Sequence, residues 1–478
     1  MRKGRSRTAY VIGSGPNGLT AAIVLARAGL DTTVIEAQPT IGGGLRSEAL
    51  TLPGFLHDVC SAVHPMAVSS PAFAKFPLAE HGLQWIYPPV SLAHPLDDGS
   101  SVLAYRSVAE TAEQLGPDAR VYKRILTPLV EHWAELVRDI LAPPHVPKHP
   151  LLLARFGALA PWPAATMARL LFRTPAARAL FAGMAAHAIL PLEMLGSAAF
   201  GWVIMLTAHA VGWPIPRGGS QRIANALASY FESLGGRIVV NTPVRSLDEV
   251  SDAGIVLCDI TPRQLLQIAG NKLPRGYCRK LERFRYGPGA YKMDWALSAP
   301  IPWKSPGCAK AATQHLGGTL DEIAASERAP WEGVASERPF TLVAQPSLFD
   351  DSRAPEGKHT AWAYCHVPNG STEDMSGRIE AQIERFAPGF RATILGRSIR
   401  TPGDLEQHNA NLVGGDINGG AQDLRQLFLR PTRSLYWTPV RGLYICSAST
   451  PPGGGVHGMC GYYAARIALG DAGHPMGD

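Results

Sequence analysis

The chain has 478 residues, of which 46% are apolar and 18% are charged. This length predicts two or three structural domains, and this composition excludes wholesale disorder. The formal net charge of +6 is modest, and no basic run is interleaved with aromatic residues, so the sequence does not predict a nucleic-acid partner.

The chain opens with a predicted strand–turn–helix–strand unit over residues 8–36. Its turn is Gly13-Ser14-Gly15-Pro16-Asn17-Gly18, a G-x-G-x-x-G sequence. The first glycine permits the tight bend, the second lets the backbone approach a pyrophosphate, and the third allows close packing of helix on strand. The helix N-terminus offers N–H groups to phosphates, and Glu36 stands where an acid accepts hydrogen bonds from a ribose. The unit therefore predicts a dinucleotide site.

The basic N-terminal segment Arg2–Arg7 precedes an apolar run, as in a signal peptide. Because that run is the first strand and helix of the nucleotide unit, we predict no export signal. The seven scattered cysteines form no C-x-x-C pair, which predicts neither a metal site nor a dithiol centre. They indicate reduced thiols in a cytoplasmic protein.

A helical insertion is predicted after about residue 105. Residues 122–141 alternate apolar and charged side chains at helical spacing, prolines follow at 143–147, and residues 151–186 are rich in Ala and Leu. The second stretch carries four arginines near two aromatic residues: Arg155, Arg169, Arg173, Arg178, Trp162 and Phe172. Two roles remain open, an amphipathic cap packed on a second domain or a surface resting on anionic lipid.

Residues 194–211 carry no formally charged side chain and have about the minimum length of a membrane-spanning helix. Glycines and polar residues dilute this stretch, and Pro191 and Pro214 bracket it. We therefore predict a buried helix that lines a pocket.

The α/β pattern then resumes with a helix at 222–234 and strands at 237–240 and 254–259. Three β-rich pieces at 291–298, 340–345 and 360–366 predict an antiparallel sheet. A final strand at 442–446 leads into a glycine-rich turn and a helix at 461–469. This order predicts a nucleotide-binding domain assembled from residues 1–66, 216–262 and 426–478. The intervening residues 67–215 and 263–425 form the predicted substrate domain.

Three stretches together carry a family resemblance: the opening unit with Ile41-Gly42-Gly43, the segment 212–220 leading to Val244, and the segment 442–458. With these, the sequence resembles the FAD-dependent phytoene desaturase-like oxidoreductases of the flavin amine oxidase group. The resemblance spans nearly the whole chain. It implies an α/β fold in which a discontinuous Rossmann-like FAD-binding domain carries an inserted α+β substrate domain, an antiparallel sheet plus the helical insertion.

The resemblance also implies a set of FAD contacts. The pyrophosphate, ribose, flavin and adenine would be held by Gly13, Ser14, Gly15, Asn17, Gly18, Glu36, Gly43, Leu45, Arg46, Val244, Ala448, Gly454, Gly455 and Val456. A helix starting near Gly458 would direct its N-terminus at the flavin and stabilise its anionic reduced form. Many relatives have Gly-Gly-Arg after the acid, whereas this chain has Gly42-Gly43-Gly44 and then Arg46 two places later.

No second strand-linked G-x-G-x-x-G occurs, so the sequence does not predict a nicotinamide site. The glycine-rich segment 413–420 lacks a preceding buried strand, and we predict a loop beside the flavin. Reoxidation by oxygen, a quinone or another carrier is therefore expected.

Three residues are candidates for contact with the substrate or the reacting flavin. His64 is either a proton acceptor or a structural histidine, and a Cys60–His64 nucleophile pair lacks a third orienting group. Arg217 either balances the reduced flavin or forms a structural salt bridge. His457 lies in the turn expected to face the flavin. Hydride transfer to flavin N5 needs little help from protein acids or bases.

These features favour an FAD-dependent oxidoreductase that dehydrogenates a small apolar substrate, such as an isoprenoid, an acyl chain or a hydrophobic secondary metabolite. A non-redox isomerase or cyclase that uses FAD is the alternative, and a non-catalytic flavin-stabilised binding protein is a third. The expected location is the cytoplasm, with peripheral membrane contact through the helical insertion as the open question raised above.

Overall fold

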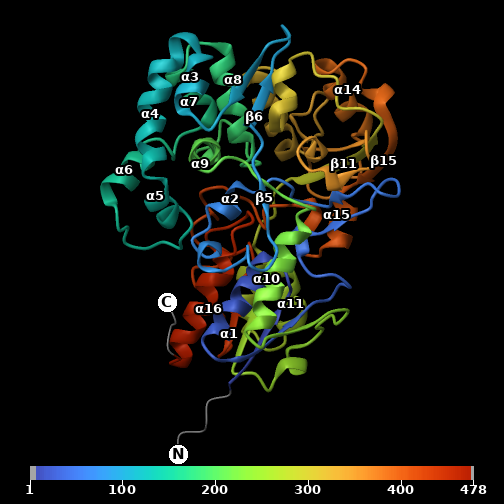
Figure 1. Cartoon of the computed structure of the whole chain (residues 1–478). Coiled ribbons are helices and arrows are strands. Elements are labelled where there is room, and N and C mark those ends of the chain that lie inside the picture. Colours follow the sequence, from blue (N-terminus) through green and yellow to red (C-terminus); the bar gives the residue numbers. More distant parts are fainter. Residues whose placement is uncertain (1–6, 475–478) are drawn as a thin grey trace, which may run out of the picture.

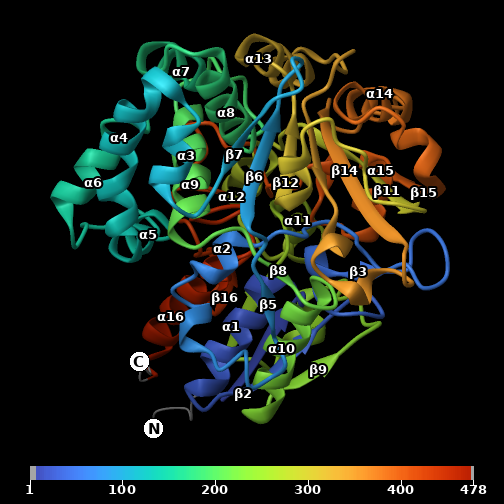
Figure 2. The same ribbon diagram turned by 45° about the horizontal axis from the view of Figure 1, so that its top comes forward.

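The computed structural model describes residues 7–474, which fold around two sheets (Figures 1 and 2). The basic N-terminal segment, apart from Arg7, lies outside the described residues. A five-stranded parallel sheet occupies the lower part of Figure 1. Its strands in spatial order are β16 (Leu443–Ile445), β10 (Ile255–Cys258), β1 (Thr8–Ile12), β2 (Asp31–Ile35) and β9 (Arg237–Val239).

The parallel sheet draws on the start, the middle and the end of the chain, because β1 pairs with β2 on one side and with β10 on the other. Helix α1 (Pro16–Arg27) connects β1 to β2 and packs against α10 (Gln221–Ser233) and α16 (Met459–Ala472). The last contact is very close: a Cβ added to Gly461 would lie 1.8 Å from the Asn17 carbonyl oxygen. Only glycine at this position lets the first and last helices of the domain meet.

The second sheet has seven strands and lies above the first in Figure 1. Its strands in spatial order are β15 (Ile394–Arg400), β11 (Gly289–Leu297), β14 (His359–Val367), β13 (Thr341–Ala344), β12 (Ala311–Leu316), β6 (Val90–Pro95) and β7 (Ser101–Ala104). The three predicted β-rich pieces are β11, β13 and β14, and they pair antiparallel as expected. The sheet as a whole is mixed, however, because β6 pairs with β12 in parallel.

The predicted helical insertion covers one end of this sheet (Figure 2). Its helices are α3 (Val108–Glu113), α4 (Ala119–Glu131), α5 (Trp133–Ile140), α6 (Pro150–Gly157), α7 (Ala164–Leu171), α8 (Pro175–Ala186) and α9 (Ser197–Ala210). The single amphipathic helix expected over 122–141 is two helices, because His132 leaves the helical conformation between α4 and α5. Trp133 is buried there, and its indole N–H donates to Ser69.

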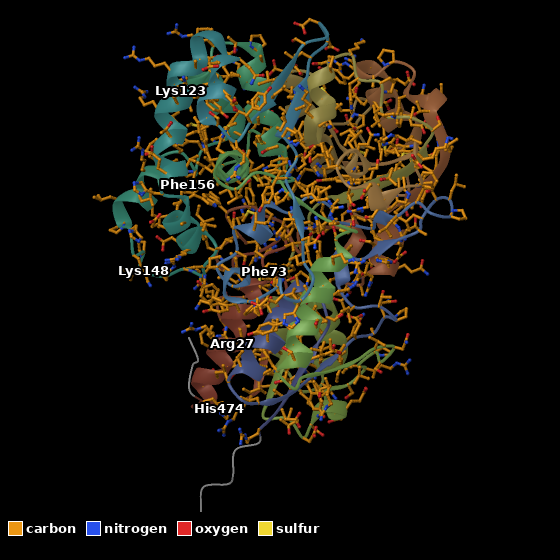
Figure 3. The ribbon with its side chains drawn as sticks, viewed as in Figure 1. Arg27, Phe73, Lys123, Lys148, Phe156 and His474 are labelled. Carbon is orange, nitrogen blue, oxygen red and sulfur yellow. The ribbon has the colours of Figure 1, made fainter. Side chains whose placement is uncertain are left out.

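Helix α9 is the buried helix predicted near residues 194–211. Among residues 7–474, every helix is too short or too polar to cross a bilayer. On the outer helices, the side chains of Lys123 and Lys148 lie at the rim, whereas Phe156 is buried against the neighbouring helices (Figure 3).

Shorter elements complete the fold. The remaining helices are α2 (Pro65–Val68), α11 (Pro262–Ala269), α12 (Arg275–Glu282), α13 (Leu320–Arg328), α14 (Ser376–Phe386) and α15 (Pro402–His408). Two small ribbons join the two layers, β3 (Ser47–Glu48) with β4 (His57–Asp58) and β5 (Trp85–Ile86) with β8 (Ile215–Pro216).

Candidate active site

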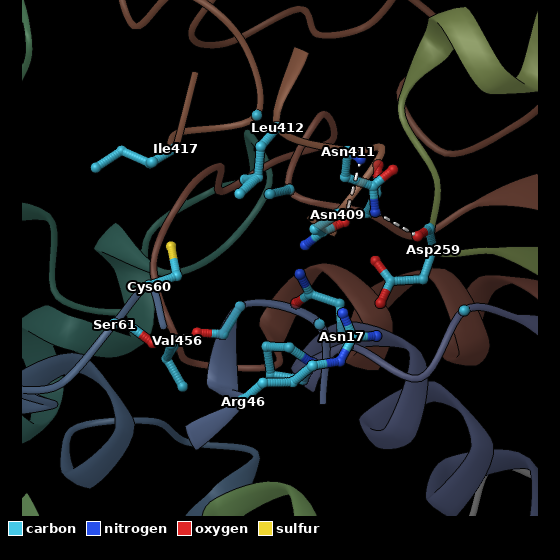
Figure 4. A pocket seen from close by; sticks show the side chains of 18 of the residues that line it. Asn17, Arg46, Cys60, Ser61, Asp259, Asn409, Asn411, Leu412, Ile417 and Val456 are labelled. Atoms are coloured by element: carbon cyan, nitrogen blue, oxygen red, sulfur yellow. Dashed lines mark hydrogen bonds between the residues drawn. The ribbon is translucent and has the colours of Figure 1, made fainter. Parts of the chain in front are cut away.

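A cavity of about 500 Å³ opens at the carboxyl ends of the parallel strands and extends toward the second sheet. This edge is where α/β sheets of this kind bind ligands. We call cofactor half the part lined by residues 12–17, 35–38, Gly43, Gly44, Arg46, 242–244, 259–261, Gln264, Gln267, Ile268, 409–411, 447–449 and 455–456. We call substrate half the part lined by residues 60–66, His187, Ile204, Trp213, Thr313, Leu342, Trp362, Tyr364, Leu412 and Ile417. Figure 4 shows Cys60, Leu412 and Ile417 across the cavity from Asn17 and Asp259.

The glycine-rich turn forms the floor of the cofactor half. Gly13 has a φ of +100°, which favours glycine, and a Cβ added to Gly18 would lie 2.1 Å from the Gly13 carbonyl oxygen. Gly13, Ser14, Gly15 and Asn17 line the cavity, whereas Gly18 packs behind them. This is the close backbone approach that a pyrophosphate requires, with the N-terminus of α1 directed at it.

Glu36 follows β2 and lines the cofactor half, as predicted for a ribose contact. One carboxylate oxygen accepts from the backbone N–H (2.9 Å) and the hydroxyl (2.5 Å) of Ser14. The other accepts from the N–H of Gln38 at 2.9 Å. The side chain is therefore held in place by the two loops that flank it.

The sequence prediction missed Asp259, which follows β10 and is buried beside the glycine-rich turn at the edge of the cavity. Its carboxylate accepts the backbone N–H of Gly18 at 2.8 Å. Burial raises the pKa of Asp259 to about 7; the N–H of Gly18 lowers it and the charge of Glu36 raises it further. The signal available in the sequence was its place at the end of a buried strand, beside the first strand in the sheet.

Asn411, also missed, fixes the backbone around Asp259. Its amide N–H donates to the Asp259 carbonyl at 2.9 Å (Figure 4), and its side-chain carbonyl accepts the N–H of Thr261 at 2.9 Å. The neighbouring segment 413–420, predicted as a loop beside the flavin, contributes Ile417, Asn418 and Gly419 to the cavity lining.

Gly43 and Arg46 line the cofactor half, but Leu45 is buried behind them and does not. The guanidinium of Arg46 donates to the carbonyls of Thr40 and His408 and lies 3.4 Å from Glu36. Arg46 is thus fixed near the adenosine end of the predicted site by three acceptors.

The C-terminal glycine-rich turn closes the other end of the cofactor half. Ala448, Gly455 and Val456 line the cavity, and so does Val244 from the middle segment. Gly454 instead packs against the backbone of Asn418, where an added Cβ would lie 2.8 Å from the carbonyl oxygen.

His457 is fully buried in this turn and does not line the cavity. Its Nδ1 accepts the N–H of Met459 at 3.0 Å, at the start of α16, and its carbonyl accepts the hydroxyl of Ser70. Burial lowers the pKa of His457 to about 4, so the ring is neutral. The geometry gives His457 a role in shaping the turn.

His64 lines the substrate half, yet its ring nitrogens are engaged or enclosed. The Ser220 hydroxyl donates to the Ser61 carbonyl, so it accepts from Nε2 of His64, 2.8 Å away. Nδ1 of His64 is buried without a partner, and burial lowers the pKa of this histidine to about 4. Burial also raises the pKa of the Cys60 thiol. These contacts are those of a structural histidine, which is one of the two roles that the sequence left open for His64.

Arg217 lies outside the cavity. Its side chain is 50% exposed and pairs at 3.3 Å with Asp351, which is itself 92% exposed. The structure therefore gives Arg217 the salt bridge that was the alternative to flavin contact, and such exposed pairs contribute little stability.

The residues fit a bound FAD. The cavity runs from Glu36 and Val244 past the glycine-rich turn to Gly455 and Val456. A Cβ added to Gly43 would lie 3.3 Å from Cα of Gly15, so both loops leave room for the phosphates only because they lack side chains. Fold and site together define a Rossmann-type flavin-dependent oxidoreductase.

Comparison with known proteins also indicates a flavin-dependent oxidoreductase. Residues 17–267 match the model of a family described as flavin containing amine oxidoreductase. A rat protein named pyridine nucleotide-disulfide oxidoreductase domain-containing protein 2 is 28% identical over 97% of this chain and 93% of its own length. A phytoene desaturase (lycopene-forming) from Paracoccus is 23% identical over 98% of each chain. The crystal structure of an oxidoreductase from Methanosarcina mazei superimposes with a TM-score of 0.66 and 15% identity, covering 95% of this chain and 98% of that one.

The chain belongs to the flavin containing amine oxidoreductase family. It is an FAD-dependent oxidoreductase, and its resemblance to phytoene desaturases is confirmed across the whole chain. The α/β fold with a Rossmann-like cofactor-binding sheet is confirmed as well.

Proposed function

We propose that this protein dehydrogenates a substrate with an apolar skeleton. The observation that carries the proposal is the lining of the substrate half, which includes six large apolar side chains: Ile204, Trp213, Leu342, Trp362, Leu412 and Ile417. Trp362 and Tyr364 stack with ring centroids 5.8 Å apart and present a flat apolar wall.

The charges of the site support an uncharged substrate over an amine. Among the described residues that line the cavity, the carboxylates are Glu36 and Asp259, and both belong to the cofactor half. An ammonium group in the substrate half would therefore lose its hydration without gaining a carboxylate partner. The Paracoccus phytoene desaturase, whose name indicates a hydrocarbon substrate, adds support.

In the proposed reaction, two adjacent carbons of the substrate each lose one hydrogen and a C=C bond forms. Bound FAD would supply the acceptor for both hydrogens, one as a hydride equivalent and one as a proton. The lining of the substrate half, which includes Trp362 and the Cys60–Met66 segment, orients the substrate and excludes water from the reacting carbons. Molecular oxygen or a quinone then takes up the electrons.

Anaerobic mixing tests this proposal. Holoprotein is mixed with limonene, phytoene or putrescine while the absorbance of oxidised flavin is followed. Lasting bleaching by limonene or phytoene and none by putrescine is the expected result. Bleaching by putrescine alone, by none of the three, or turnover of the hydrocarbons without bleaching would refute a dehydrogenase of apolar substrates, the last outcome favouring an isomerase or cyclase.

A matched pair of variants locates the reaction in the cavity. Ile204→Asp places a carboxylate in the substrate half, and Leu170→Asp places one on an exposed leucine of α7. Both should retain FAD. Only Ile204→Asp should abolish bleaching by limonene or phytoene, and equal behaviour of the two variants would contradict the assignment of the substrate half.

We also propose that the helical insertion contacts an anionic membrane. Between Asp139 and Glu193 the sequence has five Lys and Arg side chains and no acidic one. Val146 and Leu151, beside Lys148, are 89% and 87% exposed. Exposed apolar side chains beside cations are typical of proteins that lie on a lipid surface.

The surface proposed to contact the membrane is smaller than the whole arginine-rich stretch that the sequence analysis considered. Phe172 is buried, Arg178 donates to its carbonyl, and Arg169 pairs with Asp321. The proposed contact is therefore α6 and the loop before it. Sedimentation with phosphatidylglycerol vesicles tests this: Val146→Asp/Leu151→Asp should lose binding, and Leu395→Asp, on β15, should not. Equal binding to phosphatidylcholine vesicles, or no binding by the wild type, would refute it.

A further inference from the structure

A pair of buried histidines stands at the wall of the substrate half, and the reaction outlined above does not use it. His187 follows α8 and lines the cavity, whereas His315 on β12 is fully buried behind it. Their Nε2 atoms are 2.9 Å apart, a hydrogen-bond distance. Trp213, another lining residue, meets the His187 ring edge-on with centroids 5.7 Å apart.

Both rings are neutral. Burial lowers the pKa of His187 to about 3, and the nearby His366 lowers it further. Burial and the adjacent His187 and His94 lower the pKa of His315 in the same direction. Two neutral imidazoles that share one Nε2···Nε2 hydrogen bond must contribute one N–H and one lone pair.

The surroundings of His315 decide which ring donates. Its Nδ1 is buried without a partner, facing α8 so closely that a Cβ added to Gly183 would lie 2.7 Å away. A buried N–H without an acceptor is rarer than an unused lone pair, so Nδ1 carries the lone pair. His315 therefore holds its proton on Nε2 and donates it to Nε2 of His187.

It follows that His187 carries its own proton on Nδ1. The His187 ring makes one hydrogen bond within residues 7–474, the one from His315, so this N–H has no protein acceptor. In a wall that is mainly apolar, a neutral N–H donor without a protein acceptor favours binding of a neutral oxygen on the substrate. A carboxylate is not favoured, because the lining of the substrate half within the described residues contains no Lys or Arg.

We propose that Nδ1–H of His187 binds a carbonyl or hydroxyl oxygen on the substrate's apolar skeleton, with His315 as the positioning residue that fixes the tautomer of His187. This inference rests on the proposed function and names its substrate class more closely. The oxygen anchors one end of the substrate, so the carbon that reaches the flavin is set by its distance from that oxygen.

Paired ligands of one skeleton test the inference without turnover. Carvone is limonene with a ketone added, and each is titrated into holoprotein while the flavin absorption spectrum is followed. One buried hydrogen bond predicts that the wild type binds carvone about tenfold more tightly than limonene. Carvone binding no tighter than limonene, including the case in which neither binds, would overturn the inference.

Variants test whether His187 is the residue that donates a hydrogen bond to the carvone oxygen. His187→Phe keeps an aromatic ring beside Trp213 and should remove the preference for carvone without weakening limonene binding. His187→Gln keeps an N–H donor and should retain part of the preference. Thr313→Val is the matched control, because Thr313 is another polar lining residue. Loss of the preference in Thr313→Val, or its survival in His187→Phe, would overturn the assignment.

The role of His315 needs a readout that a merely structural residue would not change. Side-chain ¹⁵N shifts of the wild type should show His187 protonated on Nδ1 and His315 on Nε2, with His187→Gln and His315→Gln assigning the signals. His315→Phe should weaken carvone binding but not limonene binding, and His315→Gln, which still donates an N–H, should restore it. The opposite tautomers would refute the inference even if a variant fails to fold. Failure of the proposed function would appear separately, as absence of flavin bleaching.

Discussion

The two halves of one cavity are built by different means. In the cofactor half, the recognition elements are mostly backbone groups at glycines and at strand ends, grouped into short local motifs. In the substrate half, side chains come from a helix end, two helices, three strands and several loops that lie far apart in the chain. Recognition by backbone leaves a motif in the sequence, whereas recognition by dispersed side chains leaves none.

The largest effect is expected from adding one methyl group to the cofactor half. Gly18→Ala would place its Cβ 2.1 Å from the Gly13 carbonyl oxygen, so the turn and α1 must separate. We expect FAD affinity to fall at least about a hundredfold, because the phosphate contacts depend on that packing. The flavin-to-protein absorbance ratio after gel filtration measures it. Gly377→Ala, at a glycine with open space around it, is the control, and similar FAD loss in both would contradict the comparison.

A buried ion pair between the two layers should give the next largest effect. Arg353 lies 3.0 Å from Asp58 and 2.9 Å from Asp350, and its side chain is fully buried. Arg353→Met would leave both carboxylates without their cation and should lower the free energy of unfolding by about 3–5 kcal/mol. Urea denaturation measures the loss. Arg217→Met removes an exposed pair and should change stability by less than about 1 kcal/mol.

Asp259 should make the cofactor half sensitive to pH. Its folded pKa of about 7 lies above the ordinary value of 3.8, so the native state binds more protons between these values and loses stability as the pH rises. This contribution is about 2 kcal/mol between pH 5 and pH 7. Asp259→Asn should remove it, so the variant gains stability relative to wild type as the pH rises. A constant difference between the two unfolding curves across this range would show that Asp259 does not titrate as described.

The smallest effect is expected at His64, in the substrate half. His64→Gln keeps a donor for Ser220; in the wild type, Nε2 donates to Ser220 and the unpartnered Nδ1 is enclosed by protein, away from the substrate. The anaerobic rate of flavin bleaching should therefore change by less than about threefold. A loss of a hundredfold or more would restore His64 as a proton acceptor.

The contrast between the halves also explains what the sequence could predict. Strands β1 and β2 have the predicted bounds, and α1 begins three residues early because Pro16 fits the first turn of a helix. Glu36 and the turns at Gly13 and Gly455, which were predicted to contact FAD, line the cavity. Local patterns of this kind determine local structure, and the predicted cofactor contacts depend on that local structure.

Other features depend on contacts between distant segments. Strands β6 and β12 pair although more than two hundred residues separate them, and nothing near either strand indicates this partner. The wall formed by His187, Trp213 and Trp362 likewise exists only after the insertion has packed on the second sheet. His457 and Arg217 have the side chains expected of a reactive site, but packing directs one into its own turn and the other to the surface.

The contact between α1 and α16 determines when the nucleotide site can be completed during synthesis of the chain. The glycine-rich turn is synthesised long before the helix that packs against it at Gly461. Strand β16, at the edge of the same sheet, comes just before that helix. The nucleotide site of the nascent chain therefore stays incomplete until α16 has been made, and FAD can be enclosed only after that.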